Sequence, residues 1–138
     1  MHVHTTIIIC GALVAALVFL LGFWVSMTRA RTRVIYNDEV TPPESAMAKA
    51  QRAHGNSAEY AGAVIGVFIL VSIAYTGRDL GLLVTSLVIA VTVGRFAHAL
   101  GCLTCRTLAA PHPLKAIGAV LTYFGGAALA GLAIAKAI

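Results

Sequence analysis

The chain has 138 residues, of which 59% are hydrophobic and only 11% charged, and its mean hydropathy is +0.90. Charged residues make up about a quarter of a soluble domain, so this composition excludes a soluble globular fold and indicates a membrane protein. The net charge of +5 does not point to a nucleic acid partner, because the basic residues lie mainly beside apolar segments, where membrane topology accounts for them.

Four apolar segments follow one another along the chain, and each is close to the roughly 20 residues that cross a bilayer. We place these spans at about residues 5–27, 57–76, 80–103 and 114–135. Because they leave little room for anything else, we expect residues 1–138 to form a single four-span membrane domain. The predicted fold is all-α, an integral membrane up-and-down four-helix bundle.

The polar connections predict where the helices begin and end. Pro42 and Pro43 interrupt the first and longest connection, and Ser45 or Thr41 is the expected N-cap of a second helix that begins outside the bilayer. The first apolar segment lacks the basic flank of a signal peptide and exceeds its usual apolar length, so we expect a retained helix. A turn at residues 77–79 joins the second and third spans.

Lysine and arginine are distributed unevenly between the two ends of the predicted bundle. The termini and the second connection carry only Arg78 and Lys136. The first and third connections carry seven basic residues, namely Arg29, Arg31, Arg33, Lys49, Arg52, Arg106 and Lys115. By the positive-inside rule, connections 29–52 and 106–115 are expected to be cytoplasmic and both termini non-cytoplasmic.

Small residues recur at helical spacing on two of the spans. The second span carries Ala58, Gly62 and Gly66, and the fourth carries Gly118, Thr122, Gly126 and Ala130. Such ladders let helix backbones approach closely in lipid. We expect both ladders to mark helix contacts, either within one chain or between chains.

Glu59 and Arg95 are ionisable residues inside predicted spans, where a charge costs roughly 2.5 to 3.5 kcal/mol and usually faces a partner or a cavity. Counted from the 77–79 turn at about 1.5 Å per residue, Glu59, Arg95 and His98 lie at nearly one depth, roughly 24 to 28 Å away. An interhelical ion pair between Glu59 and Arg95 is one interpretation. The number of further polar residues at this depth favours a ligand site.

Helical geometry sorts these polar residues into faces. At about 100° per residue, Arg52, Asn56 and Glu59 form one stripe on the second helix. His54 falls on the far side and is expected to have a different role. A second stripe, on the third helix, consists of Arg95, His98 and Cys102.

The run from Arg52 to Tyr60, RAHGNSAEY, and the run from Gly94 to His98, GRFAH, resemble the R-A-H-x-N-x-x-E and G-R-x-x-H signatures of one membrane family. This family comprises the membrane-associated proteins in eicosanoid and glutathione metabolism (MAPEG), and the pattern of four spans is similar over essentially the whole chain. The resemblance implies a homotrimer in the lipid bilayer. It also implies glutathione, as substrate or ligand, at each subunit interface near the cytoplasmic face, and a hydrophobic small molecule as second substrate.

The same resemblance implies a set of glutathione-binding residues, Arg29, Arg52, Asn56, Glu59, Arg95 and His98. Their chemistry suits the ligand. Glutathione has two carboxylates, which arginines bind through paired hydrogen bonds, and one amine, which a glutamate can bind.

Two positions depart from the family pattern. Cys102 stands where many members have a tyrosine. Near the third connection, where an arginine stabilises the glutathione thiolate in family enzymes, this chain has only Arg106 and Lys115. The catalytic residues therefore stay unknown, with Arg106 and Lys115 as candidates and Arg29 or a neighbouring subunit as alternative sources of the cation. A cation near the sulfur lowers the pKa of the thiol and so raises the fraction of reactive thiolate. Because that arginine is absent or displaced in this chain, we expect slow or absent conjugation of an electrophile.

The cysteines admit further interpretations. Cys102 and Cys105 have the spacing of a redox dithiol, and with His98 and His112 they form an H-x3-C-x2-C-x6-H series that could bind zinc. We favour ordinary cysteines at a helix end and predict no metal site.

Two other functions stay open at this point. In a small four-span transporter, Glu59 would be the coupling carboxylate. A non-catalytic membrane scaffold is the other alternative. The polar residues cluster towards one end of the bundle, which favours a MAPEG-like glutathione transferase or peroxidase acting on hydrophobic electrophiles.

Overall fold

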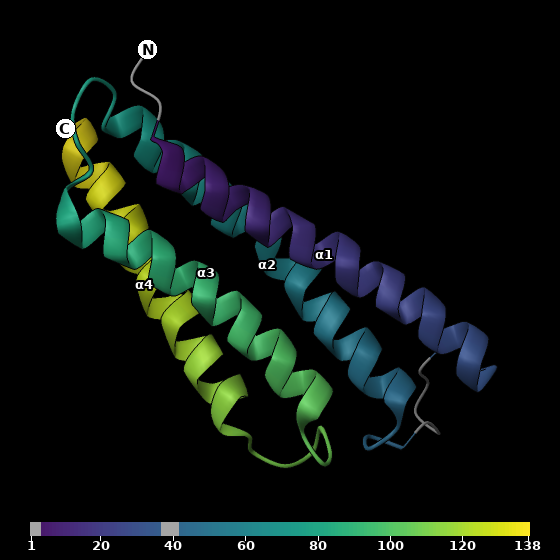
Figure 1. The fold of residues 1–138 in the computed structure, drawn as a ribbon. Coiled ribbons are helices and arrows are strands. Elements are labelled where there is room, and N and C mark those ends of the chain that lie inside the picture. Colours follow the sequence, from purple (N-terminus) through teal and green to yellow (C-terminus); the bar gives the residue numbers. More distant parts are fainter. Residues whose placement is uncertain (1–3, 37–41) are drawn as a thin grey trace.

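The computed structural model describes residues 4–36 and 42–138, and within them all regular structure is helical. Four helices follow in chain order: α1 (Thr5–Thr32), α2 (Ala46–Ala74), α3 (Gly81–Thr104) and α4 (Pro113–Ala137) (Figure 1). Each is long and apolar enough to cross a membrane. The predicted all-α, four-helix membrane fold is confirmed.

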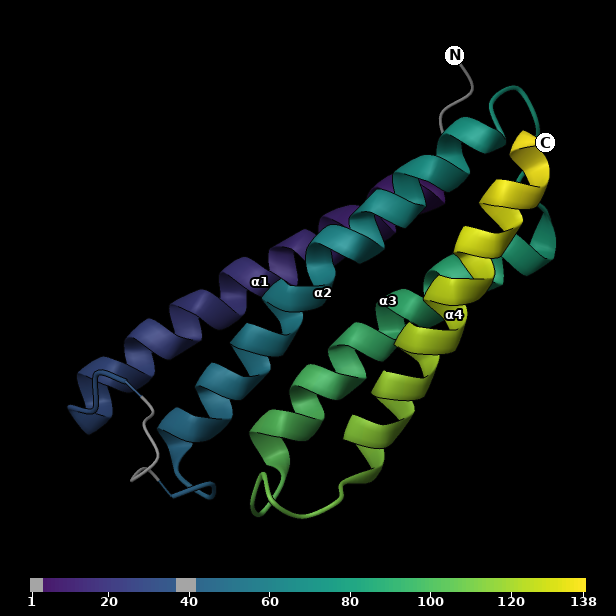
Figure 2. The same cartoon turned by 180° about the vertical axis from the view of Figure 1, so that it is seen from behind.

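The helices run alternately up and down. The start of α1, the α2–α3 turn and the end of α4 lie at one end of the bundle, and the other two connections lie at the opposite end (Figure 1, Figure 2). Gly77 and Gly81, with φ of 75° and 72°, flank the tight α2–α3 turn in a backbone conformation that other residues rarely adopt. The two connections that carry most of the lysine and arginine therefore share one end of the molecule.

At that end, α1 and α2 extend beyond the apolar spans. After α1, Arg33 adopts a left-handed conformation, with φ of 58°, and donates its backbone N–H to the Arg29 carbonyl. Before α2, the Ser45 hydroxyl oxygen accepts a hydrogen bond from the Ala48 N–H at 3.1 Å. Ser45 is thus the N-cap, as predicted, and the alternative cap Thr41 lies outside the described residues.

Glycines bring the backbones of α3 and α4 together. A Cβ added at Gly118 would lie 2.5 Å from the Gly94 carbonyl oxygen and 2.5 Å from the His98 nitrogen. The expected helix contact is therefore confirmed at the first position of the α4 ladder. On α2, a Cβ added at Gly62 or Gly66 would meet no atom of the described residues within 4 Å, so these two positions of the ladder face outward.

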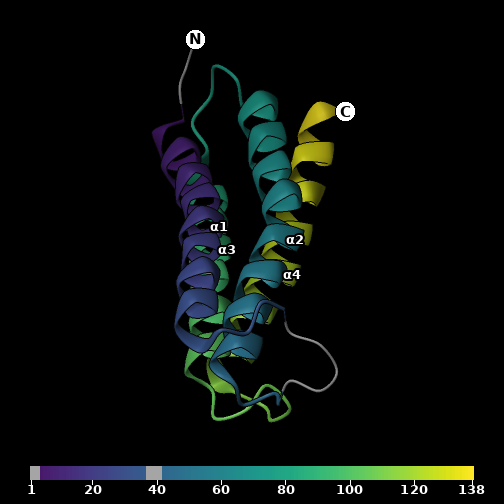
Figure 3. The ribbon, with the colours of Figure 1, turned by 90° about the vertical axis from the view of Figure 1, so that its right-hand side faces the viewer.

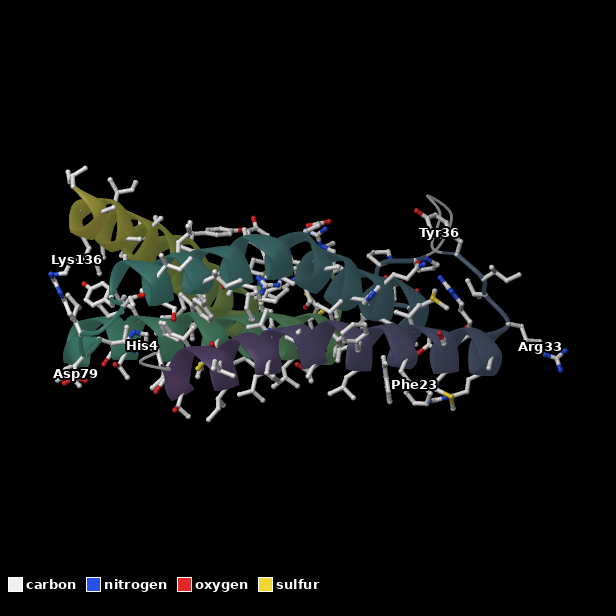
Figure 4. The ribbon with its side chains drawn as sticks, turned by 90° about the horizontal axis from the view of Figure 1, so that it is seen from above. His4, Phe23, Arg33, Tyr36, Asp79 and Lys136 are labelled. Carbon is white, nitrogen blue, oxygen red and sulfur yellow. The ribbon has the colours of Figure 1, made fainter. Side chains whose placement is uncertain are left out.

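Within the described residues, α1 packs on α2 and α3 and does not contact α4 (Figure 3). The outer faces are strongly apolar, with Phe19 78% and Leu82 84% exposed. Phe23 points away from the bundle on α1, whereas Arg33 lies at one end of the molecule and Lys136 at the other (Figure 4). Apolar side chains on this scale are unfavourable in water and suit contact with lipid, as expected of an integral, multi-pass membrane protein.

Candidate ligand-binding site

A polar cavity of about 360 Å³ lies where the end of α1 faces the first half of α2. Arg29, Arg52 and Glu59, three of the residues predicted to bind glutathione, line this cavity and are exposed to it. We call it the arginine groove. Its walls consist of Val25, Arg29, Tyr36, Ala48, Gln51, Arg52, His54, Gly55, Glu59 and Leu108.

The extra helical turns outside the apolar spans create this groove. Arg29 lies in the last turn of α1, where a cation interacts favourably with the partial negative charge of the helix C-terminus. Arg52 lies in the second turn of α2, which begins at Ala46, and therefore at the same end of the bundle. Two guanidinium groups from different helices thus reach one cavity.

His54 also lines the arginine groove, although it is not among the residues predicted to bind glutathione. Its ring points to α1, where a Cβ added at Gly22 would lie 3.3 Å from His54 Nε2. Helical geometry places His54 on the far side of α2 from Arg52 and Glu59, and the different role expected for it stays a prediction. A groove between two helices spans a wide arc of α2, and His54 falls within it.

Arg95 is buried between α2 and α3, and its hydrogen-bond partner is Asn56. The Arg95 Nη2 atom donates to the Asn56 backbone carbonyl at 3.0 Å and to Asn56 Oδ1 at 2.8 Å. The interpretation of an ion pair with Glu59 is therefore not supported, because Asn56, 4% exposed, faces α3 while Glu59 is exposed. The predicted stripe is therefore divided, because Asn56 contacts Arg95 of α3 whereas Glu59 lines the arginine groove.

Tyr60 completes the surroundings of Arg95. The Arg95 Cζ atom lies 5.0 Å from the centroid of the Tyr60 ring, a cation–π contact. That ring in turn lies 5.6 Å from the Tyr123 ring of α4. Sequence patterns do not assign Tyr60 a role, although its i, i+4 spacing from Asn56 places both on one helix face.

An apolar groove of about 410 Å³ runs between α2 and α4. Its walls are Tyr60, Ala63, Val64, Val67, Thr122, Tyr123, Gly126, Ala127 and Ala130. None of these residues belongs to the arginine groove, so the two surfaces are separate. The apolar groove can accept a hydrophobic molecule but carries no charge for an anionic one.

A smaller pocket of about 230 Å³ shares Arg52 and Leu108 with the arginine groove. We call it the cysteine pocket, and its walls are Arg52, His98, Cys102, Leu108 and Lys115. His98 Nδ1 lies 3.0 Å from the Lys115 carbonyl oxygen, and Lys115 Nζ donates to the Leu108 carbonyl at 3.2 Å. Of the two catalytic candidates, Lys115 lines this pocket and Arg106 lines neither cavity.

The series His98, Cys102, Cys105 and His112 does not form a metal site in the part of the chain that the structure describes. There, no group of three or more His, Cys, Asp or Glu side chains is close enough together to hold an ion. Cys105 Sγ instead donates to the Cys102 carbonyl oxygen at 3.2 Å. Cys102 and Cys105 are both buried free thiols.

The chemistry of these two adjoining cavities follows from their side chains. The arginine groove offers two cations for carboxylates and one acid for an amine. The cysteine pocket adds a thiol, an imidazole and an ammonium group beside Arg52. A small anionic molecule that also carries an amine and extends into the second cavity matches this arrangement.

Comparison with known proteins identifies the family. The model of the MAPEG family matches residues 7–135, a region that reaches into all four helices. No curated protein and no solved structure matches the chain. Because the family match covers nearly the whole sequence, the chain belongs to the MAPEG family.

Proposed function

We propose that this membrane protein binds glutathione in the arginine groove and presents the glutathione sulfur to hydrophobic electrophiles that arrive from the lipid. The observation that carries the proposal is that Arg29, Arg52 and Glu59 line one cavity. Glutathione-related activity is typical of the MAPEG family, which supports the same ligand.

The charges of the groove match the functional groups of glutathione. Arg29 and Arg52 suit its two carboxylates, because a guanidinium group can bind a carboxylate through two parallel hydrogen bonds. Glu59 suits its amine. Because Arg52 also lines the cysteine pocket, a peptide held by Arg52 can place its sulfur near Cys102 and Lys115.

The remaining predicted binding residues have less direct roles in this proposal. His98 lines the cysteine pocket and faces the sulfur end of the ligand. Arg95 and Asn56 belong to neither cavity wall and are positioning residues, because their hydrogen bonds hold α2 against α3 at the level of the groove. The apolar groove between α2 and α4 is the proposed place for the hydrophobic second substrate.

Calorimetry of the purified protein with glutathione tests the proposal. We expect Glu59→Gln to weaken binding at least about tenfold, because losing one charge-assisted contact costs about 1.5 to 3 kcal/mol. Glu44→Gln is the matched control, since Glu44 is also exposed but lies outside the arginine groove. Equal affinity of the two variants, or no binding by the wild type, would refute a glutathione site in this groove.

Catalysis is a separate expectation. Lys115 Nζ already donates hydrogen bonds to the Leu108 and Ala110 carbonyls, which leaves one N–H of the ammonium group for a sulfur. We therefore expect conjugation of a model electrophile to be slow or absent. A pH titration of the thiolate ultraviolet absorbance of bound glutathione checks this, and thiolate formation well below the pKa of free glutathione would contradict it.

A further inference from the structure

Two thiols lie at the end of α3, beside the proposed glutathione site. Cys102 is 1% exposed and lines the cysteine pocket, and Cys105 is 3% exposed and follows the last residue of α3. The Cys105 Sγ atom donates to the Cys102 carbonyl oxygen, so its side chain points back towards Cys102. The third cysteine, Cys10, lies in α1 and packs in a different apolar cluster.

The backbone allows these two thiols to join. Residues three apart on a helix have Cα atoms roughly 5 Å apart, within the range that a disulfide spans. Cys105 has already left helical geometry, with ψ of 151°, so rotation of its side chain does not disturb the hydrogen bonds within α3. A disulfide between Cys102 and Cys105 therefore requires only a local rearrangement.

The surroundings of Cys102 point to a particular oxidant. Arg52 and Lys115 line the same pocket as the Cys102 thiol, so a disulfide that carries carboxylates is attracted to the sulfur. The pocket also adjoins the arginine groove through Arg52 and Leu108, so one half of glutathione disulfide can lie in the groove while its sulfur faces Cys102.

We propose that Cys102 and Cys105 form a redox-active dithiol that reacts with glutathione disulfide held between the arginine groove and the cysteine pocket. The inference rests on the proposed glutathione site. It gives Cys102 the attacking role, because Cys102 lines the pocket, and Cys105 the resolving role, because Cys105 does not.

The reaction consists of two thiol–disulfide exchanges. First, the Cys102 sulfur, having lost its proton, attacks one sulfur of glutathione disulfide, and the S–S bond breaks. One glutathione leaves as a thiolate and takes up a proton, while the other stays on Cys102 as a mixed disulfide. Cys105, having lost its proton, then attacks the Cys102 sulfur, and the bond between Cys102 and glutathione breaks. The second glutathione leaves as a thiolate and takes up a proton. The protein dithiol is oxidised to a disulfide, and glutathione disulfide is reduced to two molecules of glutathione.

Intact-mass analysis of the full chain, reduced and then treated with glutathione disulfide before acid quenching and alkylation, tests the proposal. In the wild type we expect an internal disulfide, which peptide mapping locates at Cys102 and Cys105. Cys105→Ser should accumulate a glutathione adduct on Cys102, whereas Cys102→Ser should form neither product. Cys10→Ser is the matched control and should behave as the wild type.

Two results would overturn the proposed dithiol. The first is that the folded wild-type protein stays fully reduced in glutathione disulfide, although the same reagent oxidises the unfolded protein completely. The second is a glutathione adduct on the wild type that never converts to the internal disulfide. The wild-type peptide map does not depend on whether the serine variants fold, so a misfolded variant does not obscure the result.

A second oxidant separates this inference from the proposed function. We expect glutathione disulfide to oxidise the pair at least about tenfold faster than 2-hydroxyethyl disulfide, which has no charged groups, and Glu59→Gln to remove that preference. If both reagents oxidise the pair at the same rate and Glu59→Gln changes neither rate, the redox-active dithiol is supported and the glutathione site is refuted. If calorimetry detects glutathione but no internal disulfide forms, the dithiol fails and the glutathione site stands.

Discussion

Arg95 places a charged guanidinium group inside the helical bundle of a membrane protein, where burial of a charge is energetically costly. Such a group costs several kcal/mol unless other groups satisfy it. Here Arg95 Nη2 donates two hydrogen bonds to Asn56 and the guanidinium group faces the Tyr60 ring, whereas Nε is buried and has no hydrogen-bond partner among the described residues. The same contacts turn the Asn56 side chain towards α3 and leave Glu59 to the arginine groove.

At the residue scale we predict that Arg95→Leu lowers stability more than the double substitution Asn56→Leu with Arg95→Leu. The single change leaves a buried, unsatisfied amide oxygen on Asn56, at a cost of about 1 to 3 kcal/mol, whereas the double change removes both polar partners. Thermal unfolding in detergent measures both. Arg78→Leu, at an exposed position at the other end of the bundle, should change the melting temperature little. A double variant less stable than Arg95→Leu would argue against the Arg95–Asn56 pair.

At the scale of elements, the contact between α3 and α4 depends on the absence of side chains. Gly118 meets the Gly94 carbonyl and the His98 backbone, and neither can move without shifting a helix. Close backbone contact through small residues is a principal way for helices to pack in lipid, where apolar surface alone gives little drive for association. The same contact brings together the walls of the cysteine pocket, because α3 contributes His98 and Cys102 and α4 contributes Lys115.

We therefore predict that Gly118→Ala destabilises the protein by about 1 to 3 kcal/mol, the usual cost of overpacking. Gly131→Ala is the matched control on the same helix, since a Cβ there meets nothing within 4 Å. It should leave stability unchanged or raise it slightly, because alanine favours the helical state over glycine. Thermal unfolding of the two variants in one detergent provides the comparison. Similar melting temperatures would show that α3 and α4 do not pack as closely as described.

At the scale of the whole molecule, the two glycines of the α2 ladder contact no other helix among the described residues. Gly62 and Gly66 face open space, and such small-residue stripes let helices of separate chains approach. Together with the family membership, this supports the proposed homotrimer. The orientation with both basic connections in the cytoplasm is likewise a proposal that follows from the charge distribution.

Native mass spectrometry in a mild detergent should show three chains, and Gly62→Leu should shift the population towards monomer. Gly131→Leu, which adds the same side chain at an exposed position of α4, is the control. A monomer or dimer as the main species would contradict the homotrimer, and if it binds glutathione it would show that the arginine groove is complete within one chain. Labelling of a cysteine introduced at Thr107 tests the orientation of the protein in the membrane. If that cysteine is modified only from outside the cell, the proposed cytoplasmic location of the 106–115 connection is wrong.

The sequence by itself determined the class and the connectivity of this protein. Apolar length specifies four membrane-spanning helices, because each must satisfy its backbone within itself in lipid. Local chemistry places the Ser45 cap, and helical spacing puts Arg52 and Glu59 on the same side of α2. These features depend on residues close together in the chain, so pattern and propensity are sufficient to predict them.

Only the tertiary structure decided which of these residues meet. Arg95 donates its hydrogen bonds to Asn56 and not to Glu59. His54 lines the arginine groove, and Leu108 lines both that groove and the cysteine pocket. Helical spacing gives the angle of a side chain around its own axis, but the neighbour at that angle depends on how each helix is rotated and tilted against the next. Those rotations depend on contacts between residues distant in sequence, such as the hydrogen bonds of Arg95 to Asn56 and the glycine contacts between α3 and α4.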